Sequence, residues 1–371
     1  MTDGVRDRAY LRRAVRLAVR GHGGAEPNPM VGCLLVAADG TVVAEGYHRR
    51  CGEGHAEANA LARAGGRARG ATAYVTLEPC AHHGRTPPCA DALVTAGVAR
   101  VVYATPDPNP IARGGAERLR SAGIAAVHVP CPEADALNAP FLHRVRTGLP
   151  WVTAKWAQSL DGKIATRTGQ SAWISSERSR RMVHRERGRV DAIMVGFQTA
   201  RHDDPRLTAR NVRRRRTAAR VVVDPHGELP RTLHVFDDAA PTIVIAKPDV
   251  ALRLRGEGRL AVALGADGSY RPALAALARD HGISTLLVEG GGGLLGSLVR
   301  EHLVNEAFVF VAPIVLGDED AIDPVRGLTP LSIADATRFV PSPPRQRGVD
   351  TLLQVRKAEG SGFGVRGKDR P

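Results

Sequence analysis

The sequence predicts an α/β protein with two domains that meet near residue 149. The chain has 371 residues, which is too long for one ordinary hydrophobic core. Strand-like apolar runs alternate with helical patterns in both halves, and this alternation is typical of α/β architecture. The stretch HRVRTGLP (143–150) separates the two sets of elements, which show no internal repeat.

The first half opens with a helix at residues 6–20, which places Leu11, Ala14, Val15 and Ala18 on one face. Turn residues and changes of periodicity then mark the later elements. They are a hairpin at 31–48 that turns at Asp39-Gly40, a helix from near His55, a strand at 71–78, a helix from Cys89, a strand at 99–105, a helix at 115–122 and a strand at 124–130.

The second half contains six apolar runs that we interpret as strands, most of them separated by helical patterns. They lie at 151–158, 190–196, 219–224, 242–246, 283–289 and 307–317. We therefore expect one α/β domain over residues 1–148, a second over 149–358, and a flexible basic tail at 359–371.

Positive charge dominates the chain, with 52 Lys and Arg against 38 Asp and Glu, or +14 in total. This charge suits nucleic acid and anionic small substrates equally well. Two basic stretches, Arg213–Arg216 and the tail from Pro341 onward, are interpreted as a solvated loop and a frayed terminus.

The first residues, MTDGVRDRAY, are charged, and no apolar run approaches the roughly 18 residues that a membrane span requires. Five cysteines, an odd number, also fit a reducing compartment. We therefore expect a cytoplasmic protein whose paired cysteines bind metal rather than form a disulfide. No role is assigned to Cys33, Cys51 or Cys131.

The stretch TLEPCAHHGRTPPC (76–89) brings Cys80 and Cys89 to either end of a short loop. Together with His55, at the start of the helical stretch HAEANALARA, they would offer zinc one imidazole and two thiolates. Three protein ligands leave a fourth tetrahedral position open, as in catalytic zinc sites. The start of the helix at Cys89 is expected to help keep that sulfur ionised.

Glu57 lies two residues after His55, a spacing that does not place both side chains on one helix face. It is therefore a poor fourth ligand and a good candidate to move a proton at the zinc site. H-x-E followed by P-C and a second cysteine is the signature of zinc nucleobase deaminases, although their two cysteines are closer in sequence. In an alternative arrangement, His82 or His83 completes a closed structural zinc site.

Four segments together resemble the deaminase half of the bifunctional riboflavin-biosynthesis deaminase–reductases: PNPMVG (27–32), HAEANAL (55–61), TLEPCAHHGRTPPC (76–89) and DPNP (107–110). The resemblance implies a three-layer fold like that of cytidine deaminases. It also implies that His55, Cys80 and Cys89 hold zinc, that Glu57 transfers the proton and that Asn28 contacts the pyrimidine. His82, His83 and Asp107 are further candidates on the phosphoribosyl side.

The most suggestive stretch of the second half is LLVEGGGGLLGSLV (286–299), a strand, four glycines and a helix. Gly291, Gly293 and Gly296 match G-x-G-x-x-G, but the sequence that follows lacks the ribose-binding acid of a Rossmann unit. Glycines at a helix start can still let backbone N–H groups approach a pyrophosphate. Tight packing alone is the other explanation for such a loop.

SLDGKIA (159–165), SAWISS (171–176), VGFQTARHDDPRLTAR (195–210) and VEGGGGLLGSL (288–298) resemble the same family's reductase half, which has a fold like dihydrofolate reductase and uses NADPH. The resemblance assigns cofactor binding to Ala157, Trp173, Thr199, Asp203, Gly291, Gly292, Gly293, Leu294, Leu295, Gly296 and Ser297. It assigns substrate binding to Ser171, Arg187, Leu207, Arg210 and Glu289. Arginines suit this role because a guanidinium can pair with two phosphate oxygens.

The resemblance implies a bifunctional enzyme. It would deaminate 2,5-diamino-6-(5-phosphoribosylamino)pyrimidin-4(3H)-one at zinc and reduce the ribosyl group to ribityl with NADPH, as a homo-oligomer without nucleic-acid or membrane partners. Two other function classes were weighed, a nucleic-acid-editing deaminase and a zinc-stabilised binding module. The first needs exposed aromatic side chains for base stacking, and aromatic residues make up only 4% of this chain.

Overall fold

The computed structural model describes residues 3–84 and 87–358. The chain divides into two compact units, an N-terminal unit of Met1–Leu149 and a C-terminal unit of Pro150–Pro371. None of the described helices combines the length and the apolar character that crossing a membrane requires.

A five-stranded sheet forms the centre of the N-terminal unit, in the order β2-β1-β3-β4-β5. β1 is antiparallel to β2 and β3, whereas β3, β4 and β5 are parallel. The elements are α1 (Asp3–Ala18), η1 (Val19–Gly21), β1 (Gly32–Val36), β2 (Val42–Tyr47), α2 (Ala56–Ala64), η2 (Gly65–Ala68), β3 (Thr72–Val75), α3 (Cys89–Ala96), β4 (Arg100–Tyr103), α4 (Gly115–Ser121), β5 (Ala125–His128), α5 (Pro132–Leu137) and α6 (Ala139–Thr147).

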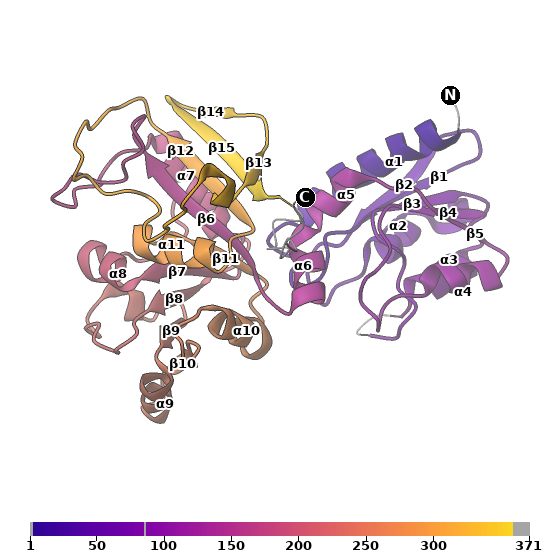
Figure 1. Cartoon of the computed structure of the whole chain (residues 1–371). Helices are drawn as coiled ribbons and strands as arrows, with labels where there is room; N and C mark the ends of the chain where they lie inside the picture. Colours follow the sequence, from indigo (N-terminus) through magenta and orange to yellow (C-terminus); the bar gives the residue numbers. More distant parts are fainter. Residues whose placement is uncertain (1–2, 85–86, 359–371) are drawn as a thin grey trace, which may run out of the picture. The chain divides into compact units, whose positions relative to one another are not determined.

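Helices cover both faces of this sheet, so the unit has three layers (Figure 1). Successive side chains of β1 point to opposite faces of the sheet, and each face is covered by helices. Cys33 and Leu35 pack with residues of α2, α3 and α4, whereas Leu34 and Val36 pack with α1 and α5. With both faces buried, β1 is apolar throughout. The expected cytidine-deaminase-like three-layer fold is confirmed.

The predicted elements of the first half are present, although β3 is shorter than the predicted strand. The hairpin turns at Gly40, whose φ of +88° is a conformation that glycine adopts readily, and the Asp39 carboxylate accepts a hydrogen bond from Thr41 N at 2.8 Å. Two helices before residue 149, α5 and α6, were not expected.

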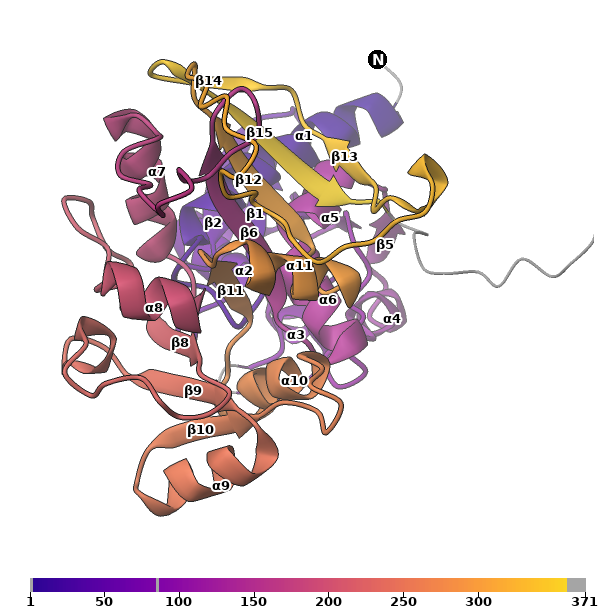
Figure 2. The same cartoon turned by 60° about the vertical axis from the view of Figure 1, so that its left-hand side comes forward.

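A sheet of ten strands forms the centre of the C-terminal unit, in the order β10-β9-β8-β7-β11-β6-β12-β15-β13, with β14 also paired to β15. The strands from β10 to β12 are parallel, and β13, β14 and β15 add antiparallel pairs. Figure 2 shows β10 and α9 at one end of this sheet and β13 to β15 at the other.

The elements of the C-terminal unit alternate between strands and helices as far as β12, as the sequence predicted, although β10 was not among the predicted strands. They are β6 (Trp151–Gln158), α7 (Glu177–Arg187), β7 (Ala192–Gly196), α8 (Phe197–Asp203), β8 (Ala219–Val223), η3 (His234–Phe236), β9 (Thr242–Ala246), α9 (Pro248–Gly256), β10 (Leu260–Ala263), α10 (Arg271–Asp280), β11 (Thr285–Val288), α11 (Gly292–Arg300), β12 (Glu306–Val311), η4 (Ile333–Asp335), β13 (Phe339–Pro341), β14 (Arg345–Arg347) and β15 (Asp350–Lys357).

The interpretation of the chain from Pro341 as a frayed terminus is wrong for residues 341–357. β15 lies between β12 and β13 within the sheet, and Leu352 packs on Val183 and Phe310 in a buried cluster. The many polar residues of β15 concealed its alternating pattern, because only one face of the strand is buried. The expected tail at 359–371 lies outside the described residues.

Leu352→Ala should lower the free energy of unfolding of the C-terminal unit by about 2–5 kcal/mol, since it opens a cavity in a packed cluster. Leu252→Ala is the matched control, because Leu252 on α9 is 67% exposed whereas Leu352 is 0% exposed. Chemical denaturation followed by circular dichroism would measure both. Equal effects of the two substitutions would contradict a structural role for β15.

Candidate functional site

His55 lies immediately before α2, as its N-cap residue, with extended backbone angles of φ −68° and ψ 169°. Its imidazole makes no capping hydrogen bond to the helix, so the ring is free to face another partner. Cys89 is the first residue of α3, after Pro88, and Cys80 follows β3 by five residues. Three separate segments thus supply the three predicted zinc ligands.

These three side chains meet. The Nδ1 atom of His55 lies 3.3 Å from the sulfur of Cys89 and 3.6 Å from that of Cys80. All three ligand atoms lie within 4.8 Å of one another, and this is the only such group of His, Cys, Asp and Glu side chains within residues 3–84 and 87–358. Ligands about 2.0–2.3 Å from a tetrahedral zinc would be separated by roughly this spacing, so the donor set fits the metal.

The two thiols influence each other's ionisation. A hydrogen bond from Cys89 lowers the pKa of Cys80, against the opposing effect of burial. The same bond raises the pKa of Cys89, and burial raises it further. Metal binding requires both sulfurs as thiolates and would release the remaining proton.

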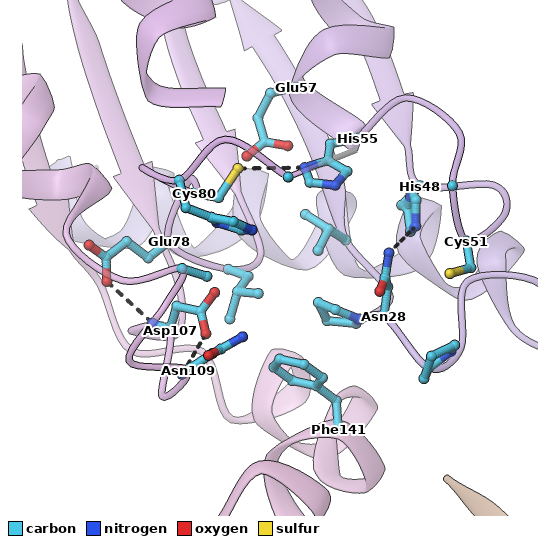
Figure 3. Close-up of a pocket in the computed structure, with 18 of the residues that line it drawn as sticks. Asn28, His48, Cys51, His55, Glu57, Glu78, Cys80, Asp107, Asn109 and Phe141 are labelled. Atoms are coloured by element: carbon cyan, nitrogen blue, oxygen red, sulfur yellow. Dashed lines mark hydrogen bonds between the residues drawn. The ribbon is translucent and has the colours of Figure 1, made fainter. Parts of the chain in front are cut away.

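Glu57 lies in the first turn of α2 and is 3% exposed. Figure 3 shows its carboxylate pointing towards the space between Cys80 and His55. Burial raises the pKa of Glu57 to about 7, and the nearby Cys80 sulfur adds to the increase. The carboxylate does not belong to the group of ligand atoms, which agrees with the sequence argument against Glu57 as a fourth ligand.

A cavity of about 400 Å³ opens beside these ligands, and its wall contains Asn28, which the sequence predicted. Asn28 Nδ2 donates to His48 Nε2 at 3.3 Å, which requires His48 Nδ1 to donate to the carbonyl of Gly54 at 3.2 Å. Burial lowers the pKa of His48 and outweighs the opposing effect of the Gly54 bond, which favours this neutral form. The Asn28 side chain is therefore oriented by a fixed imidazole (Figure 3).

Sequence reasoning missed several residues of this wall. His48 directly follows β2. Functional side chains often lie on the loops that follow strands, so this position was the signal that could have identified His48 from the sequence. Cys51, to which no role was assigned, also lies in the wall, whereas His82 lies there and not with the ligands. The lining residues that were not predicted include His48, Cys51, Glu53, Glu78, Asn109 and Phe141.

In the C-terminal unit, the predicted substrate residues Arg187 and Glu289 form a buried pair. Arg187 donates from Nε and Nη2 to the two Glu289 oxygens, at 2.6 and 2.8 Å. Burial alone would raise the pKa of Glu289, but Arg187, with Lys155 beside it, lowers it to about 2. The fork of Arg187 is therefore occupied by Glu289, which differs from the expected phosphate clamp.

Arg210 and Leu207, also predicted to hold substrate, lie on the loop that follows α8. The backbone N–H of Arg210 donates to His184 Nδ1 at 3.3 Å, and the positive charge of Arg210 lies near Arg187 and Glu289. Leu207 is 2% exposed and packs in a core cluster, so only its backbone can face a ligand. Its φ of +49° is a left-handed conformation that leucine rarely adopts.

The glycines around the start of α11 differ in how closely other atoms pack against them. A Cβ at Gly292 or Gly296 would lie 2.5 or 1.7 Å from backbone oxygens of the segment 323–326, so these two glycines are required for packing. A Cβ at Gly293 would meet nothing within 4 Å, and one at Gly291 would approach only the Thr199 hydroxyl, at 3.6 Å. The backbone around Gly293 is thus open to an approaching pyrophosphate.

The other predicted cofactor residues come from several elements, and of these Thr199 lies near Gly291. Ala157 is in β6, and Thr199 and Asp203 are in α8, which follows β7. Trp173 is 75% exposed, and the Arg180 guanidinium lies 4.5 Å from its ring centre.

Leu294 and Leu295 are buried, so only their backbone could contact a dinucleotide. The Ser297 hydroxyl accepts a hydrogen bond from Arg300. Ser171 is exposed.

One unit has the fold of a metal-binding deaminase, and the other has an α/β sheet with an open glycine loop. Together they define a two-domain deaminase–reductase. Residues 5–105 match the cytidine and deoxycytidylate deaminase zinc-binding region, and residues 150–339 match the RibD C-terminal domain. The chain belongs to the RibD family of riboflavin biosynthesis proteins, and it is a bifunctional enzyme that uses zinc and NADPH.

Relatives match over most of their own length. The riboflavin biosynthesis protein RibD of Escherichia coli is 39% identical over 95% of this chain and 99% of its own, and that of Aquifex aeolicus is 43% identical over 84% and 88%. The structure of Acinetobacter baumannii RibD superimposes with a TM-score of 0.86 at 35% identity, covering 96% of this chain and 100% of that one.

A Thermotoga maritima structure is described as a diaminohydroxyphosphoribosylaminopyrimidine deaminase/5-amino-6-(5-phosphoribosylamino)uracil reductase. It is 32% identical, has a TM-score of 0.84, and covers 96% of this chain and 99% of its own.

Gly293→Val should weaken NADPH binding at least tenfold, because its side chain would fill the open approach to the start of α11. Its effect on stability should be small, since no neighbouring atom is displaced. Gly296→Ala is the contrasting variant, expected to lower stability through the contact with the Arg326 carbonyl. Calorimetric titration with NADPH and thermal unfolding measure the two effects. An unchanged dissociation constant for Gly293→Val would contradict the cofactor role.

Proposed function

We propose that the chain performs two consecutive steps on one phosphorylated pyrimidine. Residues 1–148 would hydrolyse the amine from 2,5-diamino-6-(5-phosphoribosylamino)pyrimidin-4(3H)-one, and residues 149–358 would reduce the ribosyl group with NADPH. The product is 5-amino-6-(5-phosphoribitylamino)uracil. The observation that carries the first step is the convergence of His55, Cys80 and Cys89 beside the buried Glu57.

In the deaminase step, His55, Cys80 and Cys89 would hold zinc. Zinc bound by three protein ligands acts as a Lewis acid that makes water a nucleophile at neutral pH. Glu57 would take a proton from the attacking water and deliver it to the departing amine nitrogen, so the exocyclic C–N bond breaks, a C–O bond forms and ammonia leaves. The burial of Glu57 supports this role, because a carboxylate shielded from solvent can take up and return a proton near neutral pH.

Recognition of the pyrimidine would depend on Asn28. Its Nδ2 atom donates one of its two hydrogens to His48, and the amide oxygen can accept a hydrogen bond from a ring substituent. Because His48 is itself fixed by the Gly54 carbonyl, the direction of the Asn28 amide is set before substrate binds. This preorganisation supports a specific edge-on contact with an amine-bearing ring.

In the reductase step, Ala157, Trp173, Thr199, Asp203 and the loop Gly291–Ser297 would hold NADPH. The cofactor supplies the hydride, so the protein needs to orient it and the ribosyl carbon. Ser171, the Leu207 backbone and Arg210 would bind the substrate together with the Arg187–Glu289 pair. Arg210 supports a contact with the phosphate, because its guanidinium makes no ion pair among those found in the described residues.

Glu57→Gln should reduce ammonia release at least a hundredfold, since a positioned proton carrier typically contributes 10²–10⁴-fold. Zinc content and NADPH oxidation with the deaminated pyrimidine phosphate should remain at wild-type levels. Glu53→Gln is a suitable control, because Glu53 lines the same cavity but is exposed. Retained deamination in Glu57→Gln would refute the assignment of Glu57, and a parallel loss of NADPH oxidation would indicate a general structural defect.

We also propose a cytoplasmic homo-oligomer whose partners are the pyrimidine phosphate and NADPH, without nucleic acid or membrane. Five free cysteines support a reducing compartment. Exposed apolar side chains between residues 314 and 349 support a subunit interface in the C-terminal unit, among them Val315, Leu331 and Ile333. Light scattering should give a molar mass at least twice the 39.5 kDa of one chain, and a monomer mass would refute the oligomer.

A further inference from the structure

Glu78 lies two residues before Cys80 and lines the cavity beside the predicted zinc ligands. Its carboxylate accepts three backbone hydrogen bonds, from Asp107 N at 3.2 Å, from Gly114 N at 3.3 Å and from Ala116 N at 3.0 Å. One side chain therefore connects both ends of the segment 107–114, which we call the wall loop. Figure 3 shows the contact with Asp107.

Backbone contacts place the wall loop directly against the segment that carries Cys80. The Glu78 N–H donates to the Thr105 carbonyl at 2.8 Å, and Ala81 N–H donates to the Ala112 carbonyl at 3.0 Å. A Cβ at Gly115 would lie 1.7 Å from the carbonyl oxygen of Pro79, so only glycine allows this approach. The wall loop and the metal-binding segment are thus packed backbone to backbone.

The wall loop also maintains its own shape. Asp107 accepts a hydrogen bond from Asn109 N at 2.9 Å, and Asn109 accepts one from Ile111 N at 3.1 Å. Both side chains line the cavity, on the side away from Asn28 and His48 (Figure 3). A ligand in the cavity would therefore lie between the wall loop and the Asn28–His48 pair.

We propose that Glu78 is a positioning residue, which fixes the wall loop relative to Cys80 so that a substrate resting on Asp107 and Asn109 presents its reacting carbon to the metal ligands. This inference rests on the proposed deaminase function. A carboxylate suits the task because hydrogen bonds from N–H groups to a charged acceptor are about twice as strong as neutral ones. Without that acceptor, three N–H groups beside the cavity lose their partner.

Glu78→Gln is the sharpest test, because the amide keeps the shape of the side chain but replaces one accepting oxygen with an NH₂ group that cannot accept. We expect KM for the deaminase substrate to rise roughly tenfold while kcat stays within about twofold of the wild type. Zinc content and the NADPH-dependent reduction should not change. Glu78→Asp, which keeps the charge but is one methylene shorter, should raise KM in the same way.

Hydrogen–deuterium exchange gives a second readout that does not depend on activity. Asp107 N donates to one Glu78 oxygen, whereas Gly114 N and Ala116 N donate to the other. In Glu78→Gln, the amides on the oxygen that is replaced, either Asp107 alone or Gly114 and Ala116 together, should exchange faster than in the wild type. Glu117→Gln is the matched control, since it removes the same charge from an exposed position of α4 and should change neither exchange nor KM.

Unchanged KM and unchanged exchange in Glu78→Gln would overturn the proposal. So would a fall in kcat at constant KM, which would place Glu78 in the chemical step, or a loss of zinc without a change in KM. Absence of ammonia release by the wild-type chain would overturn the proposed deaminase function itself. In that case the exchange rates alone would decide whether Glu78 holds the wall loop.

Discussion

The N-terminal unit is organised around the meeting of one imidazole and two sulfurs. His55 comes from the start of α2, Cys89 from the start of α3, and Cys80 from the turn after β3. Cys80 and Cys89 are nine residues apart, but His55 lies 25 residues before Cys80, so only the completed three-layer fold brings all three ligand atoms within 4.8 Å. The sheet and its helices therefore determine the chemistry, because they place the three backbone segments that carry His55, Cys80 and Cys89 close together.

The charged groups around the candidate sites of the two units differ in sign. In the N-terminal unit, thiols and a buried carboxylate gather where a divalent cation would balance their negative charge. Around Glu289 in the C-terminal unit, positive groups outnumber this one carboxylate, because Lys155, Arg187 and Arg210 all lie near it. An excess of positive charge suits a phosphorylated substrate and an anionic dinucleotide. Part of the net charge of +14 is thus explained by a site for anionic small molecules and does not require nucleic acid.

Short local patterns predicted the alternating architecture of the C-terminal unit and the zinc ligands, and the resemblance to a known family implied the three-layer fold. The sequence could not reveal β15, which reads as a polar tail and becomes a strand only through its pairing with β12. It could not show that Arg187 binds Glu289, since 102 residues separate them. Nor could it distinguish Gly293 from Gly296, whose difference depends on the distant segment 323–326.

The most direct test of this account is zinc X-ray absorption spectroscopy on the purified full-length chain. We predict one zinc per chain, coordinated by two sulfurs at about 2.3 Å, one imidazole nitrogen at about 2.0–2.1 Å and one further light atom. A shell with two imidazoles would mean that His82 or His83 closes the site, and three sulfurs would require another cysteine. Either result, or a chain that binds no zinc, would contradict the proposal of a catalytic zinc with a position open to water.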